Sequence, residues 1–173
     1  MLDFAHDPAS AELARRLNFS FVLPGRLAGL GWPFLRNVSP QATAELLRTA
    51  GVAVLVNLTG EPYPHAARSA LAALRLVDIP VNDYTPPTLK QANELWALFS
   101  ALPAGQVLAI HCAAGVGRTG TLLACLLGRE RGLSAEEAVS QLRLLRPPSV
   151  ETLEQEEFVA EWLLHGQAPG CWT

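Results

Sequence analysis

Apolar and polar positions along this chain fall into short blocks that predict strands and helices in turn. Three short apolar runs have the length of buried strands, at 52–58, 74–77 and 106–110. Runs with apolar residues at helical spacing lie between and before them, at 40–50, 64–73 and 88–102. Because strands and helices follow one another, the pattern predicts an α/β fold with a central, mostly parallel sheet flanked by helices.

The last third of the chain predicts three helices in succession, at 118–131, 134–145 and 150–165. Gly132 separates the first two, and Pro147-Pro148 separates the last two. Ser134 has Glu137 three residues after it, which is the pattern of a capping box at a helix start.

Residues 111–120 read HCAAGVGRTG and form the turn between the predicted strand 106–110 and the helix that follows it. Glycines at 115, 117 and 120 allow successive backbone N–H groups to converge on one point. The positive end of the helix dipole adds to these groups. The turn is therefore expected to bind an anion.

The side chains of this turn suit phosphoryl transfer. Cys112 would lie at the mouth of the anion site, where a helix N-terminus and an arginine favour the nucleophilic thiolate. Arg118 carries a planar fork that can bind two phosphoryl oxygens. Thr119 can stabilise the sulfur as a leaving group, and His111 can hold the loop backbone in shape. The phosphate-binding backbone would come from the residues between cysteine and arginine, Ala113, Ala114, Gly115, Val116 and Gly117.

A cysteine without such neighbours is most often a small core residue, and a glycine-rich turn without them is weak evidence of an anion site. Here the cysteine, five residues, an arginine, a threonine and a glycine occur in order at a strand-to-helix junction. The string matches the HCx5R[ST]G motif of the cysteine-dependent protein tyrosine phosphatase superfamily. The flanking segments resemble the small atypical dual-specificity phosphatases of the VHZ type, at 22–29, 146–152 and 154–156.

The resemblance covers about residues 18–165 and implies a single-domain protein tyrosine phosphatase-like fold. The active-site loop would join a strand to a helix N-terminus. We therefore expect a catalytic domain over 18–165, an N-terminal extension over 1–17 and a C-terminal tail over 166–173.

The resemblance also implies a general acid on an upstream loop, which would protonate the leaving group and later accept a proton from water. Asp83 is the candidate, because the similar sequences place an aspartate, an aromatic residue and prolines in this order. Asp78 is the alternative, although it precedes Ile79-Pro80 and is expected to end a strand. A further reading makes Asp83 an ordinary residue of a polar turn.

Four more polar residues are weaker candidates. Glu151 and Gln155, one helical turn apart, correspond to polar residues near the loop in similar enzymes, and Gln155 would position the attacking water. Both equally fit a solvated face of an acidic helix. Glu61 follows the apolar run 52–58 and would help to order Arg118. Arg26 would line the rim of the pocket or simply be solvated.

Composition and charge limit the classes of substrate and partner that fit this chain. The chain has 173 residues, a formal net charge of −3 and five glutamates between 151 and 161, which argues against a nucleic-acid partner. None of the five residues inside the loop is charged, so one arginine would face one phosphate. A phosphotyrosine-containing protein or an aryl phosphate is the expected substrate, and the resemblance extends this to phosphoserine and phosphothreonine.

Three alternatives stay open: a phosphoinositide or other small-molecule phosphatase of the same superfamily, a phosphopeptide-binding pseudophosphatase, and a rhodanese-like sulfurtransferase. Cysteines at 112, 125 and 171 form no disulfide or metal-binding pattern, so neither a metal nor another cofactor is expected. Cys125 is expected in the core. Neither a signal peptide nor a membrane-spanning run is evident, which predicts a cytoplasmic protein without a membrane partner. We also expect the protein to be a monomer.

Overall fold

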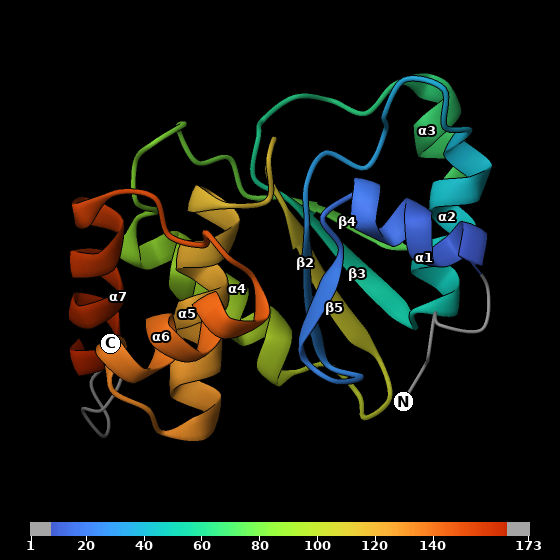
Figure 1. Ribbon diagram of the computed structural model, residues 1–173. Helices are drawn as coiled ribbons and strands as arrows, with labels where there is room; N and C mark the ends of the chain where they lie inside the picture. The colour runs from blue at the N-terminus through green and yellow to red at the C-terminus, as the bar shows by residue number, and fades with distance from the viewer. Residues whose placement is uncertain (1–7, 166–173) are drawn as a thin grey trace.

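The centre of the fold is a five-stranded sheet, seen in a computed structural model that describes residues 8–165 (Figure 1). The strands lie in the order β1-β2-β5-β3-β4. Their bounds are β1 Ser20–Leu23, β2 Leu27–Leu30, β3 Val52–Asn57, β4 Arg75–Asp78 and β5 Val107–His111.

The sheet is mixed but mostly parallel, as the sequence predicts. β5 pairs in parallel with β2 on one side and with β3 on the other, and β4 extends the parallel part at one edge. Only β1 is antiparallel, and it forms a hairpin with β2 in which Ser20 lies opposite Gly29. The carboxyl ends of the parallel strands therefore lie together at one end of the sheet. Ligand-binding sites of open α/β sheets form at this end.

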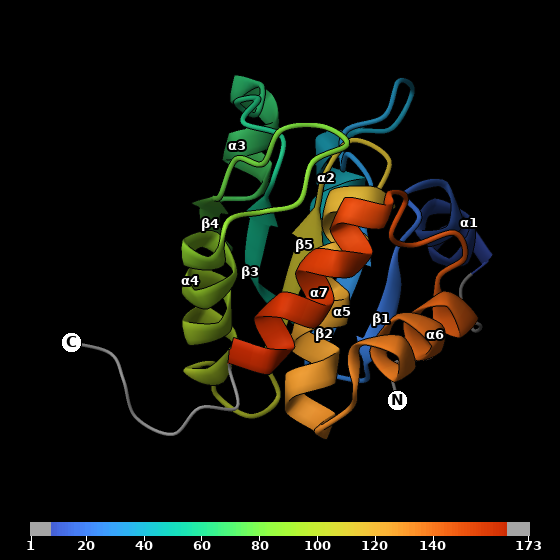
Figure 2. The same cartoon turned by 90° about the vertical axis from the view of Figure 1, so that its left-hand side faces the viewer.

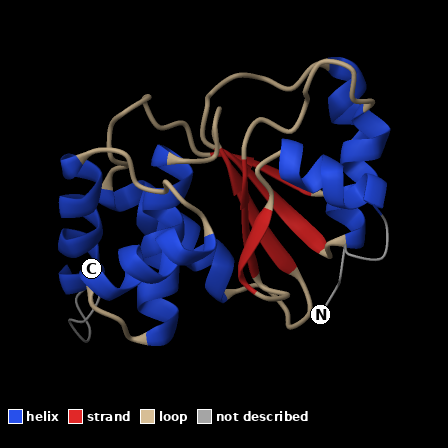
Figure 3. Cartoon of the chain, in the orientation of Figure 1, coloured by secondary structure: helices blue, strands red, loops and turns tan. Residues whose placement is uncertain are grey.

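Helices cover both faces of the sheet (Figures 1 and 2). One face carries α1 (Pro8–Arg16), α2 (Pro40–Thr49) and α3 (His65–Ala70). The other carries α4 (Leu89–Ser100), α5 (Gly117–Arg131), α6 (Ala135–Leu145) and α7 (Leu153–His165). Figure 3 shows the resulting three layers, with the strands between two groups of helices. Each face buries its own apolar cluster, because successive strand residues point to opposite faces.

Helix α5 fills the middle of one layer. Every residue from Gly117 to Gly128 is buried, as expected for a helix that is apolar around its whole circumference. Cys125 is 1% exposed on this helix, which confirms it as a core residue. The helix ends at Gly132, which adopts the left-handed conformation (φ 65°) that favours glycine at a helix C-terminus.

The predicted elements from residue 40 onward are confirmed within a few residues. The largest boundary differences are three residues: α3 ends at Ala70 rather than at 73, and α7 starts at Leu153 rather than at 150. Ser134 and Glu137 form the predicted capping box at the start of α6. The sequence analysis missed the first three elements, the helix α1 and the two four-residue strands β1 and β2.

Arg26 does not line the pocket, so that expectation is wrong. It lies in the turn between β1 and β2, at the end of the sheet opposite the 111–120 loop. Its guanidinium donates to the carbonyl of Leu102 (2.9 Å) and lies 5.0 Å from the centre of the Phe99 ring. Among the described residues, no helix has both the length and the apolar character that a bilayer crossing requires.

Candidate active site

The 111–120 loop lies at the carboxyl end of the sheet, in the middle of the strand order. His111 ends β5 and Gly117 begins α5, so residues 112–116 connect a buried strand directly to a helix N-terminus. β2 and β3 flank β5, and the segments that follow them surround the loop. The first N–H groups of α5 lack partners within the helix and are available to a ligand.

Neighbouring segments hold the loop from outside. Trp32 N–H donates to the carbonyl of Ala113 (2.8 Å), and the Asn18 side chain donates to the carbonyl of Ala114 (3.1 Å). Because a trans peptide points its N–H away from its C=O, these outward carbonyls leave the N–H groups facing inward. This arrangement is an anion-binding nest.

Gly115 is required at its position for two reasons. Its φ is 76°, and a Cβ there would lie 2.5 Å from the carbonyl carbon of Leu30 in β2. The same residue donates its N–H to the sulfur of Cys112 (3.3 Å), which is 3% exposed at the base of the loop. The tight approach of loop and strand therefore aims a hydrogen-bond donor at the candidate nucleophile.

Arg118 joins the loop to the segment before α4. One Nη donates to the carbonyl of Val81 (3.1 Å), and the other lies 2.9 Å from a carboxylate oxygen of Asp83. The Nε of Arg118 and the hydroxyl of Thr119 are both buried and have no hydrogen-bond partner in the protein. Because unpaired buried polar atoms are costly, the Arg118 Nε points to an oxyanion as its missing partner, and the Thr119 hydroxyl is free to donate to a group at the loop.

The two candidate acids differ in their surroundings. Asp83 is exposed (61% for its side chain) in the loop between β4 and α4, and its partner is the loop arginine Arg118. Asp78 is the last residue of β4 and accepts a hydrogen bond from Asn57 of β3 (2.9 Å). The geometry therefore places Asp83 at the anion site and gives Asp78 a role in joining two strands.

Gln155 and Glu151 lie against the start of α5. Gln155 is fully buried, accepts from the backbone N–H of Glu151 (2.8 Å) and donates to the carbonyl of Thr85 (3.4 Å) in the Asp83 loop. A Cβ on Gly117 would lie 3.1 Å from the Gln155 amide nitrogen and would collide with the Glu151 carboxylate. Gln155 is thus part of a packed junction and not of a solvated helix face.

His111 and Tyr63 form a buried pair behind the loop, and the sequence analysis missed Tyr63. Burial lowers the pKa of His111 to about 4 and raises the pKa of Tyr63, so both are neutral at pH 7. The Tyr63 hydroxyl then donates to His111 Nε2 (2.5 Å), and Nδ1–H donates to the carbonyl of Cys112 (3.2 Å). No periodicity or motif in the sequence marks Tyr63 for this contact.

A pocket of about 550 Å³ opens beside the loop. Its apolar lining comes from Trp32, Pro62, Pro64, Pro80 and Val81, and its charged lining from Glu61, Asp83 and Arg118. Trp32 is a further residue that the sequence analysis did not identify.

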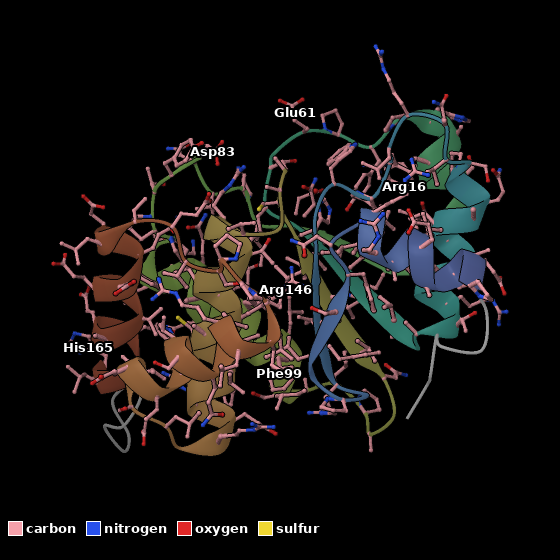
Figure 4. The ribbon with its side chains drawn as sticks, viewed as in Figure 1. Arg16, Glu61, Asp83, Phe99, Arg146 and His165 are labelled. Carbon is pink, nitrogen blue, oxygen red and sulfur yellow. The ribbon has the colours of Figure 1, made fainter. Side chains whose placement is uncertain are left out.

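Glu61 lies on this rim with its backbone fixed, since its N–H donates to the Thr59 hydroxyl (3.0 Å) and its carbonyl accepts from Asn57 (2.9 Å). Figure 4 shows Glu61 and Asp83 on separate loops at the same end of the molecule. The side chain of Glu61 is not a hydrogen-bond partner of Arg118, whose described partners are Val81 and Asp83. The geometry therefore gives no support to a role for Glu61 in ordering Arg118.

Metal-ligating side chains are not gathered at the site. Within residues 8–165, no three His, Cys, Asp or Glu side chains are grouped as a metal site. Cys171 and the predicted tail over 166–173 lie outside the described residues, as do residues 1–7.

The fold and the loop together define a domain of the cysteine-dependent protein tyrosine phosphatase superfamily. A comparison with family models is more specific: residues 16–159 match the family described as "PTP-SAK: Swiss Army Knife protein, DSP-PTPase phosphatase domain". The chain belongs to this family.

Individual proteins agree with this assignment. The tyrosine-protein phosphatase cdc-14 of Caenorhabditis elegans is 29% identical over 167 residues, which span 90% of this chain but 22% of that protein. Protein tyrosine phosphatase domain-containing protein 1 of Danio rerio is 42% identical over 81 residues, or 46% of this chain and 11% of that protein. The chain thus corresponds to a small part of these relatives.

Among solved structures, Tk-PTP in its active form is 28% identical, with a TM-score of 0.72. The match covers 85% of this chain and 97% of that one. The structural similarity therefore extends over nearly the whole of that chain.

Proposed function

We propose that this protein is a phosphatase that hydrolyses phosphomonoesters through a cysteinyl-phosphate, with protein phosphotyrosine as the preferred substrate and phosphoserine and phosphothreonine as further ones. The observation that carries the proposal is the contact between Arg118 and Asp83. Two residues far apart in sequence meet at 2.9 Å over a loop whose Arg118 Nε and Thr119 hydroxyl lack partners. A phosphoryl oxygen would supply the missing acceptor for the Arg118 Nε, and the Cys112 sulfur would supply that for the Thr119 hydroxyl.

In the first step, the Cys112 thiolate attacks phosphorus while the loop N–H groups and Arg118 bind the phosphoryl oxygens. The S–P bond forms and the P–O bond to the leaving group breaks. The leaving oxygen takes its proton from the Asp83 carboxyl group, which lies beside Arg118 and is exposed enough to reach it. The alcohol or phenol then departs.

In the second step, water attacks phosphorus of the cysteinyl-phosphate. The Asp83 carboxylate accepts a proton from this water, and the S–P bond breaks to return the thiolate. The Thr119 hydroxyl, buried without a protein partner, donates to the departing sulfur. We assign Gln155 to positioning the water, because its amide lies between the Asp83 loop and the start of α5.

The pocket supports an aryl phosphate over a polyanion. Its walls of tryptophan, proline and valine suit an aromatic ring, and its volume of about 550 Å³ leaves room for more than a phosphate group. Its charged lining consists of one cation, Arg118, and two carboxylates, Asp83 and Glu61. A ligand with several phosphates would therefore meet more negative than positive charge.

The catalytic assignment is tested with p-nitrophenyl phosphate in a metal-free buffer. We expect no turnover in Cys112→Ser and a loss of about 10²-fold in kcat in Asp83→Asn, which keeps the shape but not the acid. Cys125→Ala, in the core of α5, is the matched control for loss of a buried cysteine and should retain turnover. Turnover that survives Cys112→Ser would refute the mechanism.

The substrate assignment needs a panel in which the phosphorylated residue is the only variable. Peptides of one sequence carrying phosphotyrosine, phosphoserine or phosphothreonine are compared with short-chain phosphoinositides. We expect the highest kcat/KM with phosphotyrosine. A preference for the inositol lipids would show that the pocket charge does not govern selection and would favour the small-molecule alternative.

The proposal also covers the organisation of the chain. We place the catalytic unit at residues 18–165 and assign it to a monomeric protein of the cytoplasm that uses neither metal nor other cofactor. The acidic net charge of −3 supports a protein that binds neither nucleic acid nor anionic membrane surfaces. Light scattering after size exclusion tests the monomer, and turnover in EDTA tests the independence from metal.

A further inference from the structure

Arg146 is a buried arginine that the mechanism above does not use. It follows the last residue of α6 and is 3% exposed. Figure 4 shows its label near the centre of the molecule, away from the rim on which Glu61 and Asp83 lie. A charged side chain in such a position needs an explanation, because burying a charge without a partner is costly.

The guanidinium of Arg146 binds backbone from three separate segments. One Nη shares its two N–H groups among three acceptors, the carbonyls of Asn18 (2.8 Å) and Gly29 (2.9 Å) and the hydroxyl of Ser20 (2.6 Å). The other Nη donates to the carbonyl of Gly115 in the phosphate loop (2.9 Å). This single side chain therefore connects α6, the β1–β2 hairpin and the loop.

Gly115 is held from two sides as a result. Its carbonyl accepts from Arg146 behind the loop, while its N–H donates to the Cys112 sulfur in front (3.3 Å). The residue has a φ of 76° and packs against the backbone of Leu30, so it has little freedom to adjust. Fixing the carbonyl therefore also fixes the direction of the N–H.

In the part of the chain that the structure describes, no carboxylate pairs with Arg146. Within residues 8–165, Arg118 and Arg146 are the only buried side chains that carry a formal charge, and no buried carboxylate accompanies them. Burial lowers the pKa of Arg146 to about 10, an effect that the nearby Cys112 opposes, so the guanidinium stays charged at neutral pH. Among the described residues, Cys112 is the group whose charge acts on the Arg146 guanidinium.

We propose that Arg146 is a positioning residue of the phosphate loop, which holds the Gly115 N–H on the Cys112 sulfur and supplies a second buried positive charge that favours the thiolate. The inference rests on the proposed function only in that the thiolate serves as the nucleophile. The formation of the thiolate does not depend on phosphatase activity. A merely structural arginine would stabilise the fold and leave the titration of the sulfur unchanged.

The test measures alkylation of Cys112 by iodoacetate as a function of pH, followed by peptide mass spectrometry. In this reaction the thiolate forms an S–C bond and iodide leaves, so no phosphatase activity is needed. We expect Arg146→Met to raise the pH of half-maximal alkylation by about one unit, which is the size expected for loss of a nearby opposite charge. Arg146→Lys keeps the positive charge and should therefore raise the pH of half-maximal alkylation by less.

Arg143 provides the matched control. It lies one turn earlier on α6, forms an ion pair with Glu156 and donates to the carbonyls of Ser149 (3.0 Å) and Val150 (2.9 Å), but not to residues 111–120. Arg143→Met therefore removes an arginine that also anchors a loop, and it should alkylate like the wild type. Equal midpoints for wild type, Arg146→Met and Arg143→Met would overturn the proposal.

A second measurement covers the case in which Arg146→Met does not fold. Lysine cannot reach the Gly115 carbonyl and the hairpin acceptors at once, so Arg146→Lys should lower kcat on p-nitrophenyl phosphate relative to Arg143→Lys. Identical kcat and alkylation profiles for the two lysine variants would refute the proposal. Failure of the phosphatase assignment appears separately, as turnover that survives Cys112→Ser.

Discussion

The buried His111 should make the stability of this protein depend on pH in a specific window. Its ring is neutral in the folded state, where burial lowers the pKa from 6.5 to about 4. Both ring nitrogens are already used, by the Tyr63 hydroxyl and by the carbonyl of Cys112. A second ring proton would therefore disrupt the contact with Tyr63.

The sign follows from proton binding. Above pH 6.5, neither the folded nor the unfolded chain protonates this histidine, and its neutral contacts contribute fully to stability. Between pH 6.5 and about 4, the unfolded chain binds a proton that the folded chain does not, so acid favours unfolding. The free energy of unfolding then falls by about 1.4 kcal/mol per pH unit from this group. Between pH 7 and pH 5, the loss is about 2 kcal/mol.

A loss of this size is measurable, because domains of this kind unfold with about 5–15 kcal/mol. The assay is urea unfolding at pH 7, 6 and 5, followed by tryptophan fluorescence, for the wild type and His111→Asn. Asparagine can donate to the Cys112 carbonyl but does not titrate. His65→Asn, at an exposed position on α3, is the matched control. We expect the wild-type curve to fall more steeply than that of His111→Asn. Parallel curves would refute the reasoning.

Three further predictions concern the same region. Tyr63→Phe leaves the His111 Nε2 atom buried without a donor and should cost about 1–3 kcal/mol of unfolding free energy, measured by urea titration; an unchanged midpoint would count against the pairing. Gly115→Ala forces a Cβ to within 2.5 Å of the Leu30 backbone and should lower kcat/KM at least about tenfold, with weaker binding of inorganic phosphate by calorimetry. Burial raises the pKa of the Cys125 thiol, so this residue should escape iodoacetamide in the native protein and react only after unfolding; native labelling at Cys125, seen by mass spectrometry, would contradict its core position.

The parts of the fold that the sequence predicts are those with strong local patterns. β3 and β5 are buried on both faces, so they appear as continuous apolar runs. In the hairpin of β1 and β2 the apolar stretches are only three or four residues long. Its place depends on pairing between Leu27 and Leu108, which are far apart along the chain. A pattern search over neighbouring residues cannot detect a contact of that kind.

The residues of the site also fall into those that the sequence predicts and those that only the structure shows. Cys112 and Arg118 lie six positions apart on one loop, so their spacing alone marks them. Asp83 came from the resemblance to a family, because no local rule distinguishes a catalytic aspartate from one in a polar turn. Arg146 and Tyr63 are supporting residues brought to the loop from distant elements, and only the folded structure shows their contacts.

The distribution of buried polar side chains gives a physical reason for this division. Most of those in the described part of the chain lie at or beside the phosphate loop and the strand ends around it, among them Asn57, His111, Arg118, Arg146 and Gln155. Each is costly to bury, and hydrophobic packing elsewhere in both layers must offset that cost. Apolar periodicity predicts the packing but carries no information about such polar groups. The positions about which apolar periodicity is least informative are therefore those at which the structure gives up stability for an anion site.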